Sequence, residues 1–149
     1  LLGWLSDRWQ QRVKLLQIMA LLGFICSLAM LYGAPSLPLC FILLAGIGAA
    51  TASQILTFAL IKDHYHFGNL AAAIGFNNMA VVAGGALFQP LAGLILKLHH
   101  HHRHVSDMIH YTNEDYRIAL SAIPVCFLIG IWIATTRLKE ATPTQSSPP

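Results

Sequence analysis

The sequence predicts an all-α transmembrane fold, in which four long apolar helices cross a bilayer as part of a larger helical domain. Hydrophobic residues make up 56% of the chain and charged residues only 10%, whereas soluble domains hold roughly 25% charged residues. Charged residues and histidines are absent from three long stretches, residues 15–61, 67–96 and 118–136. Because a membrane-spanning helix needs about 20 mostly apolar residues, the first stretch holds two spans and the other two hold one each.

The composition also excludes several classes of function. A soluble helical protein with so few charges would lack the polar outer faces that water requires. The cysteines Cys26, Cys40 and Cys126 lie in the apolar stretches without metal-ligand or disulfide spacing, which is typical of small buried residues. We expect no enzyme activity, no cofactor and no nucleic-acid partner. The expected partners are the lipid bilayer and a small-molecule solute, with a coupling proton or ion left open.

The first two spans are joined by a short turn. The first is expected over about residues 13–32, and residues 33–38 after it hold one glycine and two prolines, a composition typical of a turn between helices. The second span is expected over about residues 39–61, before a polar connection of residues 62–66.

The last two spans are separated by a longer polar loop. The third is expected over about residues 70–96 and contains Pro90, which in a membrane helix bends the helix more often than it ends it. The loop takes residues 97–116, and the fourth span is expected over about residues 117–136. The tail, residues 137–149, is rich in Pro, Ser and Thr, a composition that predicts disorder.

The placement of basic residues predicts the orientation in the membrane. If the spans alternate in direction, one side of the bilayer carries Arg8, Arg12, Lys14, Lys62, Arg137 and Lys139. The other side carries only Lys97, Arg103 and Arg117. Because Lys and Arg are enriched in cytoplasmic loops, we expect the amino-terminal segment and the tail to lie in the cytoplasm. The expected location is the plasma (inner) membrane.

A charged segment precedes the first span. It reads Gly3-Trp4-Leu5-Ser6-Asp7-Arg8-Trp9-Gln10-Gln11-Arg12. Such a segment fits a tight turn between two helices, in which Asp7 meets the start of a helix, where the backbone favours an anion. The basic residues fit the level of the lipid headgroups on the positive side. On these grounds alone, a plain turn enriched in basic residues explains the segment equally well.

The same segment resembles the loop motif of the major facilitator superfamily of secondary transporters, Gly-x-Leu-x-Asp-Arg-x-Gly-Arg-Arg/Lys. The matching residues are Gly3, Leu5, Asp7, Arg8 and Arg12. Gln10 and Gln11 replace the second glycine and the basic residue after it, and such erosion resembles the family's second copy, between helices 8 and 9. The resemblance implies that residues 1–136 hold the end of helix 8, a cytoplasmic loop and helices 9–12 of the carboxyl-terminal half, followed by the cytoplasmic tail of residues 137–149.

The resemblance also implies a function. It points to a secondary active transporter that moves a small hydrophilic solute by alternating access, of which this chain is a carboxyl-terminal part. In this family the loop motif is a conformational latch. Its acid, here Asp7, contacts the start of a helix and helps to hold the outward-open state, while its basic residues engage nearby acids.

Polar side chains at membrane depth are candidates for lining a solute path, because in hydrocarbon they need a partner or a wet cavity. The candidates are Thr51, Gln54, Asn77, Asn78 and Gln89. Polar residues also join membrane helices to each other, which remains the alternative. The resemblance favours a path, since helix 10 of the family lines the cavity and helix 11 lies between the two halves. No carboxylate lies within the expected spans, so if transport is coupled to protons, the coupling acid is expected in the part of the protein outside this chain.

The outer loop contains a histidine tract. The weak metal-ligand candidates are His99, His100, His101, His102 and His104. Consecutive histidines lack the fixed spacing of a structured metal site. Because surface loops tolerate changes in sequence, a loop that acquired histidines without a function explains the tract more simply. Three alternatives stay open: a metal-ion transporter with a histidine-rich loop, a pH-responsive loop, and a membrane scaffold that transports nothing.

Overall fold

The computed structural model describes residues 11–64, 69–101 and 111–138, and every regular element among these residues is an α-helix. The helices are α2 (Arg12–Tyr32), α3 (Leu37–Ala52), α4 (Gln54–His64), α5 (Leu70–His101), α6 (Asn113–Leu120) and α7 (Ala122–Thr136). They form four helices long and apolar enough to cross a membrane, Arg12–Tyr32, Leu37–Asp63, Leu70–His99 and Asn113–Thr136. The predicted all-α fold with four spans is confirmed.

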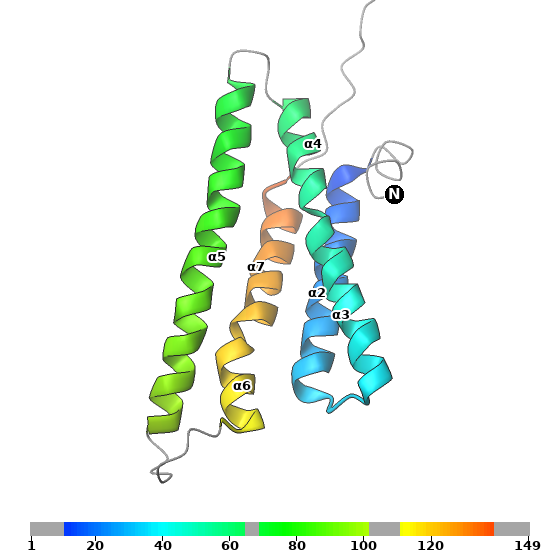
Figure 1. Cartoon of the computed structure of the whole chain (residues 1–149). Helices are drawn as coiled ribbons and strands as arrows, with labels where there is room; N and C mark the ends of the chain where they lie inside the picture. The colour runs from blue at the N-terminus through cyan, green and yellow to red at the C-terminus, as the bar shows by residue number, and fades with distance from the viewer. Residues whose placement is uncertain (1–10, 65–68, 102–110, 139–149) are drawn as a thin grey trace, which may run out of the picture.

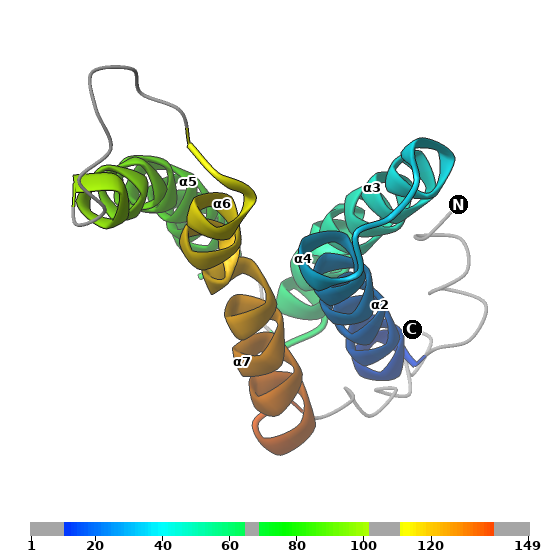
Figure 2. The same cartoon turned by 90° about the horizontal axis from the view of Figure 1, so that it is seen from below.

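The four spans run alternately up and down (Figure 1). α2 packs most extensively against α7 and α3. α5 packs mainly against α6 and α4, and the end-on view shows it standing apart from α2 and α3 (Figure 2). The bundle therefore has a close-packed part made by α2, α3 and α7, and one long helix that is attached more loosely.

The close-packed part depends on small residues at the points where helices meet. A Cβ atom on Gly23 of α2 would overlap the ring of Phe127 in α7 and would lie 2.9 Å from the Cβ atom of Ala50 in α3. A Cβ atom on Gly46 of α3 would lie 2.6 Å from Sγ of Cys26 in α2. Such close approach is how membrane helices gain van der Waals contact in the absence of a hydrophobic driving force.

The second span is interrupted at Ser53, which the sequence did not predict. Its buried hydroxyl donates to the carbonyl of Ala50 at 2.6 Å. The backbone N–H of Ser53 donates to the same carbonyl at 3.1 Å, and the N–H of Leu56 donates to the carbonyl of Ser53 at 2.8 Å. Each bond reaches back three residues instead of four, so the helix tightens locally between α3 and α4.

The fourth span begins at Asn113, four residues before the predicted start at Arg117. Thr112 and Asp115 form a capping box, in which each side chain accepts a hydrogen bond from the backbone N–H of the other residue, and this arrangement stabilises a helix start. The span is then divided at Ser121. Pro124 accounts for the division, because it has no N–H for the carbonyl of Leu120 and its ring crowds that carbonyl.

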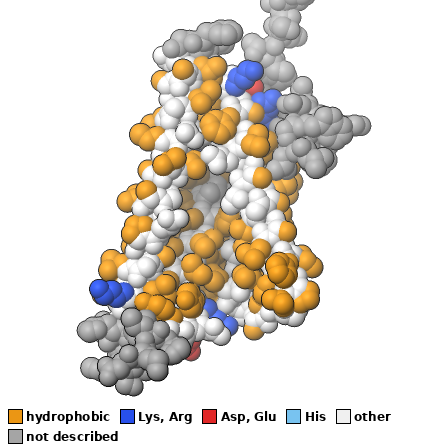
Figure 3. Space-filling view, in the orientation of Figure 1, with side chains coloured by type: hydrophobic (Ala, Val, Ile, Leu, Met, Phe, Trp, Pro, Cys, Tyr) orange, Lys and Arg blue, Asp and Glu red, His pale blue; other side chains and the backbone are white. Residues whose placement is uncertain are grey.

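The surface of the described chain is that of a membrane protein. Large apolar side chains are exposed along every span, among them Ile25, Phe41, Phe76, Leu87 and Trp132. The few Lys and Arg side chains gather at the two ends of the bundle, with hydrophobic side chains between them (Figure 3). This distribution suits helices whose outer surfaces contact lipid and further protein rather than water.

Candidate functional site

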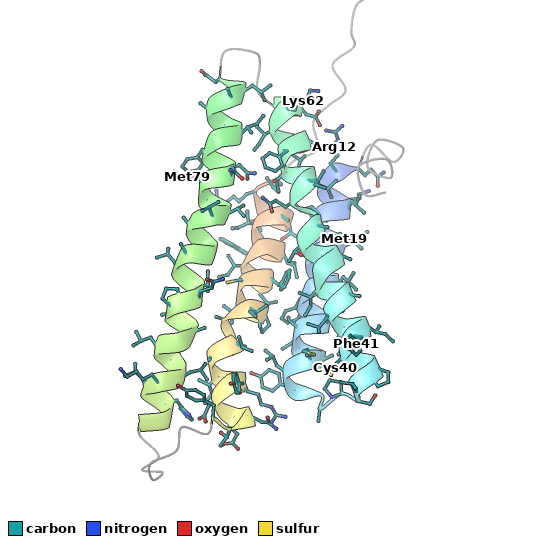
Figure 4. The ribbon with its side chains drawn as sticks, viewed as in Figure 1. Arg12, Met19, Cys40, Phe41, Lys62 and Met79 are labelled. Carbon is teal, nitrogen blue, oxygen red and sulfur yellow. The ribbon has the colours of Figure 1, made fainter. Side chains whose placement is uncertain are left out.

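One end of the bundle carries an ion pair between α2 and α4. Nη1 of Arg12 lies 2.8 Å from Oδ2 of Asp63, with side-chain exposures of 22% and 31%. Figure 4 places Arg12 and Lys62 at this same end. An exposed pair of this kind contributes about 0.2–1 kcal/mol, which suits a contact that forms and breaks.

Arg12 is also the one residue of the predicted loop motif that the structure describes. The other motif residues, Gly3, Leu5, Asp7 and Arg8, lie outside the described residues. A contact between a motif base and an acid is the kind that the resemblance led us to expect. The latch as a whole stays a prediction.

The second and third spans are joined by a polar link. The side-chain amide of Asn77 in α5 donates from Nδ2 to Oγ1 of Thr57 in α4 at 3.2 Å. The Thr57 hydroxyl in turn donates to the backbone carbonyl of Gln54 at 2.6 Å. Both residues of the link are partly buried. Of the candidates named from the sequence, Asn77 is thus joined to the backbone of Gln54, through a threonine that the candidate set omitted.

The other candidates are not brought into this link. Thr51 is exposed, and its hydroxyl donates to the carbonyl of Gly48 within its own helix at 2.9 Å. Asn78 and Gln89 are exposed on α5, and the side chain of Gln54 is half-buried. Of the predicted path residues, Asn77 therefore contacts another helix through its side chain, whereas Thr51, Asn78 and Gln89 lie on exposed helix surfaces.

α5 has three distinct sides, which follow from a rotation of about 100° per residue. The side that carries Asn77 packs against α4. Asn78, Gly85 and Gln89 lie within about 40° of one another, and we call them the polar flank. Leu87, which is 69% exposed, lies about 180° from Asn78 on an apolar side. A single helix thus has one side packed on its neighbour, one exposed side with polar residues and one exposed apolar side.

The opposite end of the bundle holds a contact that the sequence did not predict. Nδ1 of His99 in α5 lies 2.6 Å from Oδ1 of Asp115 in α6. The Asp115 side chain is 1% exposed, and its Oδ2 accepts from the N–H of Thr112 at 2.7 Å and from the Thr112 hydroxyl at 2.8 Å. Both partners belong to helices that qualify as membrane spans. The predicted spans hold no carboxylate, but the fourth helix starts four residues earlier than predicted, and its first turn carries Glu114 and Asp115.

The sequence did carry a signal for this carboxylate. A threonine followed three residues later by an acid, just before an apolar run, is the pattern of a capping box. Reading Thr112 and Asp115 in this way would have moved the helix start outward. Nothing in the sequence pairs Asp115 with His99, because sixteen residues separate them and only the packing of α5 on α6 brings them together.

The remaining histidine candidates are not tested by the structure. The side chains of His100 and His101, and all of His102 and His104, lie outside the described residues. Among the residues that the structure does describe, no group of three or more His, Cys, Asp or Glu side chains is arranged to hold a metal ion. The metal-ligand reading of the tract stays a weak prediction.

Comparison with known proteins gives one positive finding. A family model described as Major Facilitator Superfamily matches residues 1–149. No curated protein matches this chain, and no solved structure does.

Proposed function

The chain belongs to the major facilitator superfamily, and from this premise we propose that it is part of a secondary active transporter that moves a small hydrophilic solute by alternating access. Members of this family transport solutes across membranes, and this chain is an integral, multi-pass membrane protein. In the proposal its four spans correspond to helices 9–12 of the family, within residues 1–136, with residues 137–149 as a tail.

The observation that carries the proposed solute path is the exposure of Asn78 and Gln89 on the polar flank of α5, beside the link between Asn77 and Thr57. An amide side chain without a hydrogen-bond partner in hydrocarbon costs several kcal/mol, roughly 4–8 on an alkane scale. Asn78 and Gln89 are exposed in the described chain, so in a bilayer they require water, solute or further protein. This requirement supports a hydrated path along the polar flank, with α4 as its neighbour.

The ion pair between Arg12 and Asp63 fits a conformational role. Arg12 and Asp63 connect the first turn of α2 to the last turn of α4, so a base of the loop motif engages an acid of the next span. In the proposal this pair is one contact of the latch that helps to hold the outward-open state.

The proposed orientation rests on the basic residues. Of those that the structure describes, Arg12, Lys14, Lys62 and Arg137 belong to one end of the bundle, and Lys97 and Arg117 belong to the other. The excess of Lys and Arg at the first end supports a cytoplasmic position for it and for the tail. The plasma membrane is the proposed location.

Cysteine accessibility in the full-length protein tests the path. Asn78→Cys and Gln89→Cys are made in a background in which all native cysteines are replaced, with Leu87→Cys as the matched control on the same helix. We expect a membrane-impermeant, hydrophilic thiol reagent to label the two polar-flank positions and to leave Leu87→Cys unlabelled, because that side faces lipid. After denaturation in detergent the same hydrophilic reagent should label all three variants and so verify that each thiol is present and reactive.

Three results would contradict the proposal. If neither polar-flank cysteine reacts with the hydrophilic reagent, these residues join helices rather than line a path. If all three positions react equally with it, α5 does not separate water from lipid. A wild-type protein that inserts normally but transports no solute would favour a scaffold.

A further inference from the structure

A pocket of about 310 Å³ lies at the end of the bundle opposite the ion pair between Arg12 and Asp63, where α5 ends and α6 begins (Figure 1). Three helices line it with Tyr32, His99, Glu114, Arg117, Ile118 and Ser121. Each of the three membrane spans that contribute these residues has an end here, at Tyr32, His99 and Asn113. The pocket therefore lies near the level of the lipid headgroups, and it includes no residue of the polar flank.

Arg117 supplies a cation to this pocket, in a partly buried position. Among the residues that the structure describes, its guanidinium makes neither an ion pair nor a hydrogen bond. The neighbouring acid Asp115 already accepts from Thr112 and lies against His99. A guanidinium is always charged and carries five N–H donors, and donors removed from water need an acceptor. The Arg117 side chain therefore calls for an anion in or beside the pocket.

Tyr32 supplies a second donor from a different helix. It is the last residue of α2, and its phenol hydroxyl can donate one hydrogen bond. The Ser121 hydroxyl is engaged within its own helix, because it donates to the carbonyl of Ile118 at 2.7 Å. Two helices that are far apart in the sequence thus bring a guanidinium and a phenol to one pocket, a combination of donors that suits an oxyanion.

Two other lining residues indicate which oxyanion fits. Glu114 lies three residues before Arg117, on the same side of α6. Its carboxylate repels negative charge, so the pocket favours a singly charged anion over a dianion. Ile118 adds an apolar side chain to the lining, which suits a charged group with carbon substituents. A phosphodiester has one negative charge and two carbon substituents, and its oxygens match the two parallel N–H groups of an arginine.

We propose that this pocket binds a phosphodiester group, with Arg117 as its anchor and Tyr32 as the second donor. The group belongs either to a phospholipid headgroup, which lies at this level of the bilayer, or to a soluble molecule that carries the same chemistry. This inference goes beyond the proposed function, because it concerns a second binding site and does not depend on which solute is moved.

Protection of a cysteine in the pocket tests the proposal in the full-length protein. Ser121→Cys is made in a background in which all native cysteines are replaced, and Ser36→Cys, in the exposed turn at the same end of the bundle, is the matched control. The protein is purified in dodecyl maltoside, a detergent without phosphate, and the rate of labelling by an uncharged hydrophilic maleimide is measured. The probes are dioleoylphosphatidylglycerol and glycerophosphoglycerol, which is the same headgroup without acyl chains. Dioleoylglycerol, which lacks the phosphodiester, is the control lipid.

We expect a phosphodiester probe to slow the labelling of Ser121→Cys severalfold at saturation and to leave the rate at Ser36→Cys unchanged. Protection by the lipid alone identifies a lipid headgroup as the ligand, whereas protection by glycerophosphoglycerol shows that a soluble phosphodiester suffices. Equal protection by dioleoylglycerol, or no protection by either phosphodiester, would overturn the proposal.

Substitutions of the lining residues separate a specific anchor from general attraction. Arg117→Gln should abolish the protection, and Arg117→Lys should keep only part of it, because an ammonium retains the charge without the planar pair of donors. Tyr32→Phe should weaken the apparent affinity by about tenfold or more, the effect of losing one hydrogen bond to a charged group. Glu114→Gln should strengthen it, a gain that a merely damaged pocket would not give. Protection that persists unchanged in Arg117→Gln, or that weakens in Glu114→Gln, would contradict the assignment.

Discussion

Thr57 and Thr51 provide a matched pair for measuring the polar link between α4 and α5. Each hydroxyl donates to the carbonyl three residues earlier in its own helix, at 2.6 Å for Thr57 and 2.9 Å for Thr51. Only the Thr57 hydroxyl also accepts from a residue of another helix, Asn77. Valine has nearly the same shape as threonine without the hydroxyl. Thr57→Val therefore removes the local bond and the link, whereas Thr51→Val removes only a local bond.

The expected magnitude is small and follows from the geometry. Hydrogen bonds between membrane helices average about 0.6 kcal/mol and reach about 1.7 kcal/mol at most. The separation of 3.2 Å between Asn77 Nδ2 and Thr57 Oγ1 lies at the long end of the normal range of about 2.7–3.2 Å. We therefore expect a coupling energy near the average, about 0.6 kcal/mol.

A double-mutant cycle measures this coupling. The free energy of unfolding in bicelles is determined by steric trapping for wild type, Thr57→Val, Asn77→Ala and the double variant. The double variant should be about 0.6 kcal/mol more stable than the sum of the single effects predicts. Thr51→Val should be less destabilised than Thr57→Val by about the same amount. A coupling near zero, or equal losses in the two threonine variants, would refute the link.

Three further predictions concern packing, backbone strain and charge. Gly23→Ala should lower the free energy of unfolding by about 1–3 kcal/mol because of overpacking, an effect partly offset by the higher helix propensity of alanine. Gly48→Ala is the control and should be neutral or stabilising, because its new Cβ atom meets nothing within 4 Å. Equal stabilities of the two variants would contradict the close approach at Gly23. Ala34 has φ of 43°, a region that costs a residue other than glycine roughly 1–2 kcal/mol, so Ala34→Gly should raise the thermal midpoint, and an unchanged or lower midpoint would show that the strain is absent. Arg12→Asp and Asp63→Arg should each destabilise by up to about 1 kcal/mol and should compensate each other when combined; an additive double variant would mean that the two side chains do not pair.

The four spans could be predicted from the sequence because a bilayer imposes one simple requirement, a long stretch without charges. The ends of the spans could not be located in the same way. Asp115 and Arg117 are charged residues that the structure places inside a helix, and a rule that ends spans at charges assigns them to a loop. A local interaction, the capping box at Thr112, extends the helix beyond the apolar stretch.

The polar residues illustrate a second limit. Helical periodicity is enough to group Asn78 with Gln89, because their relative angle is a property of one helix. It does not identify which of two adjacent asparagines meets the neighbouring span. Asn77 makes that contact and Asn78 does not, since the rotation of α5 about its own axis is set by its packing on α4 and α6. Pairings between helices, including that of His99 with Asp115, depend on this rotation.

The loose attachment of α5 has a mechanical consequence. Side chains near its two ends hold the helix to its neighbours: Asn77 contacts α4, and His99 contacts α6. Pro90 lies between these two contacts. It deprives the Ala86 carbonyl of its usual backbone partner and so makes the helix easier to bend there. If either contact is lost, the other stays in place, and we expect the two ends of α5 to move separately.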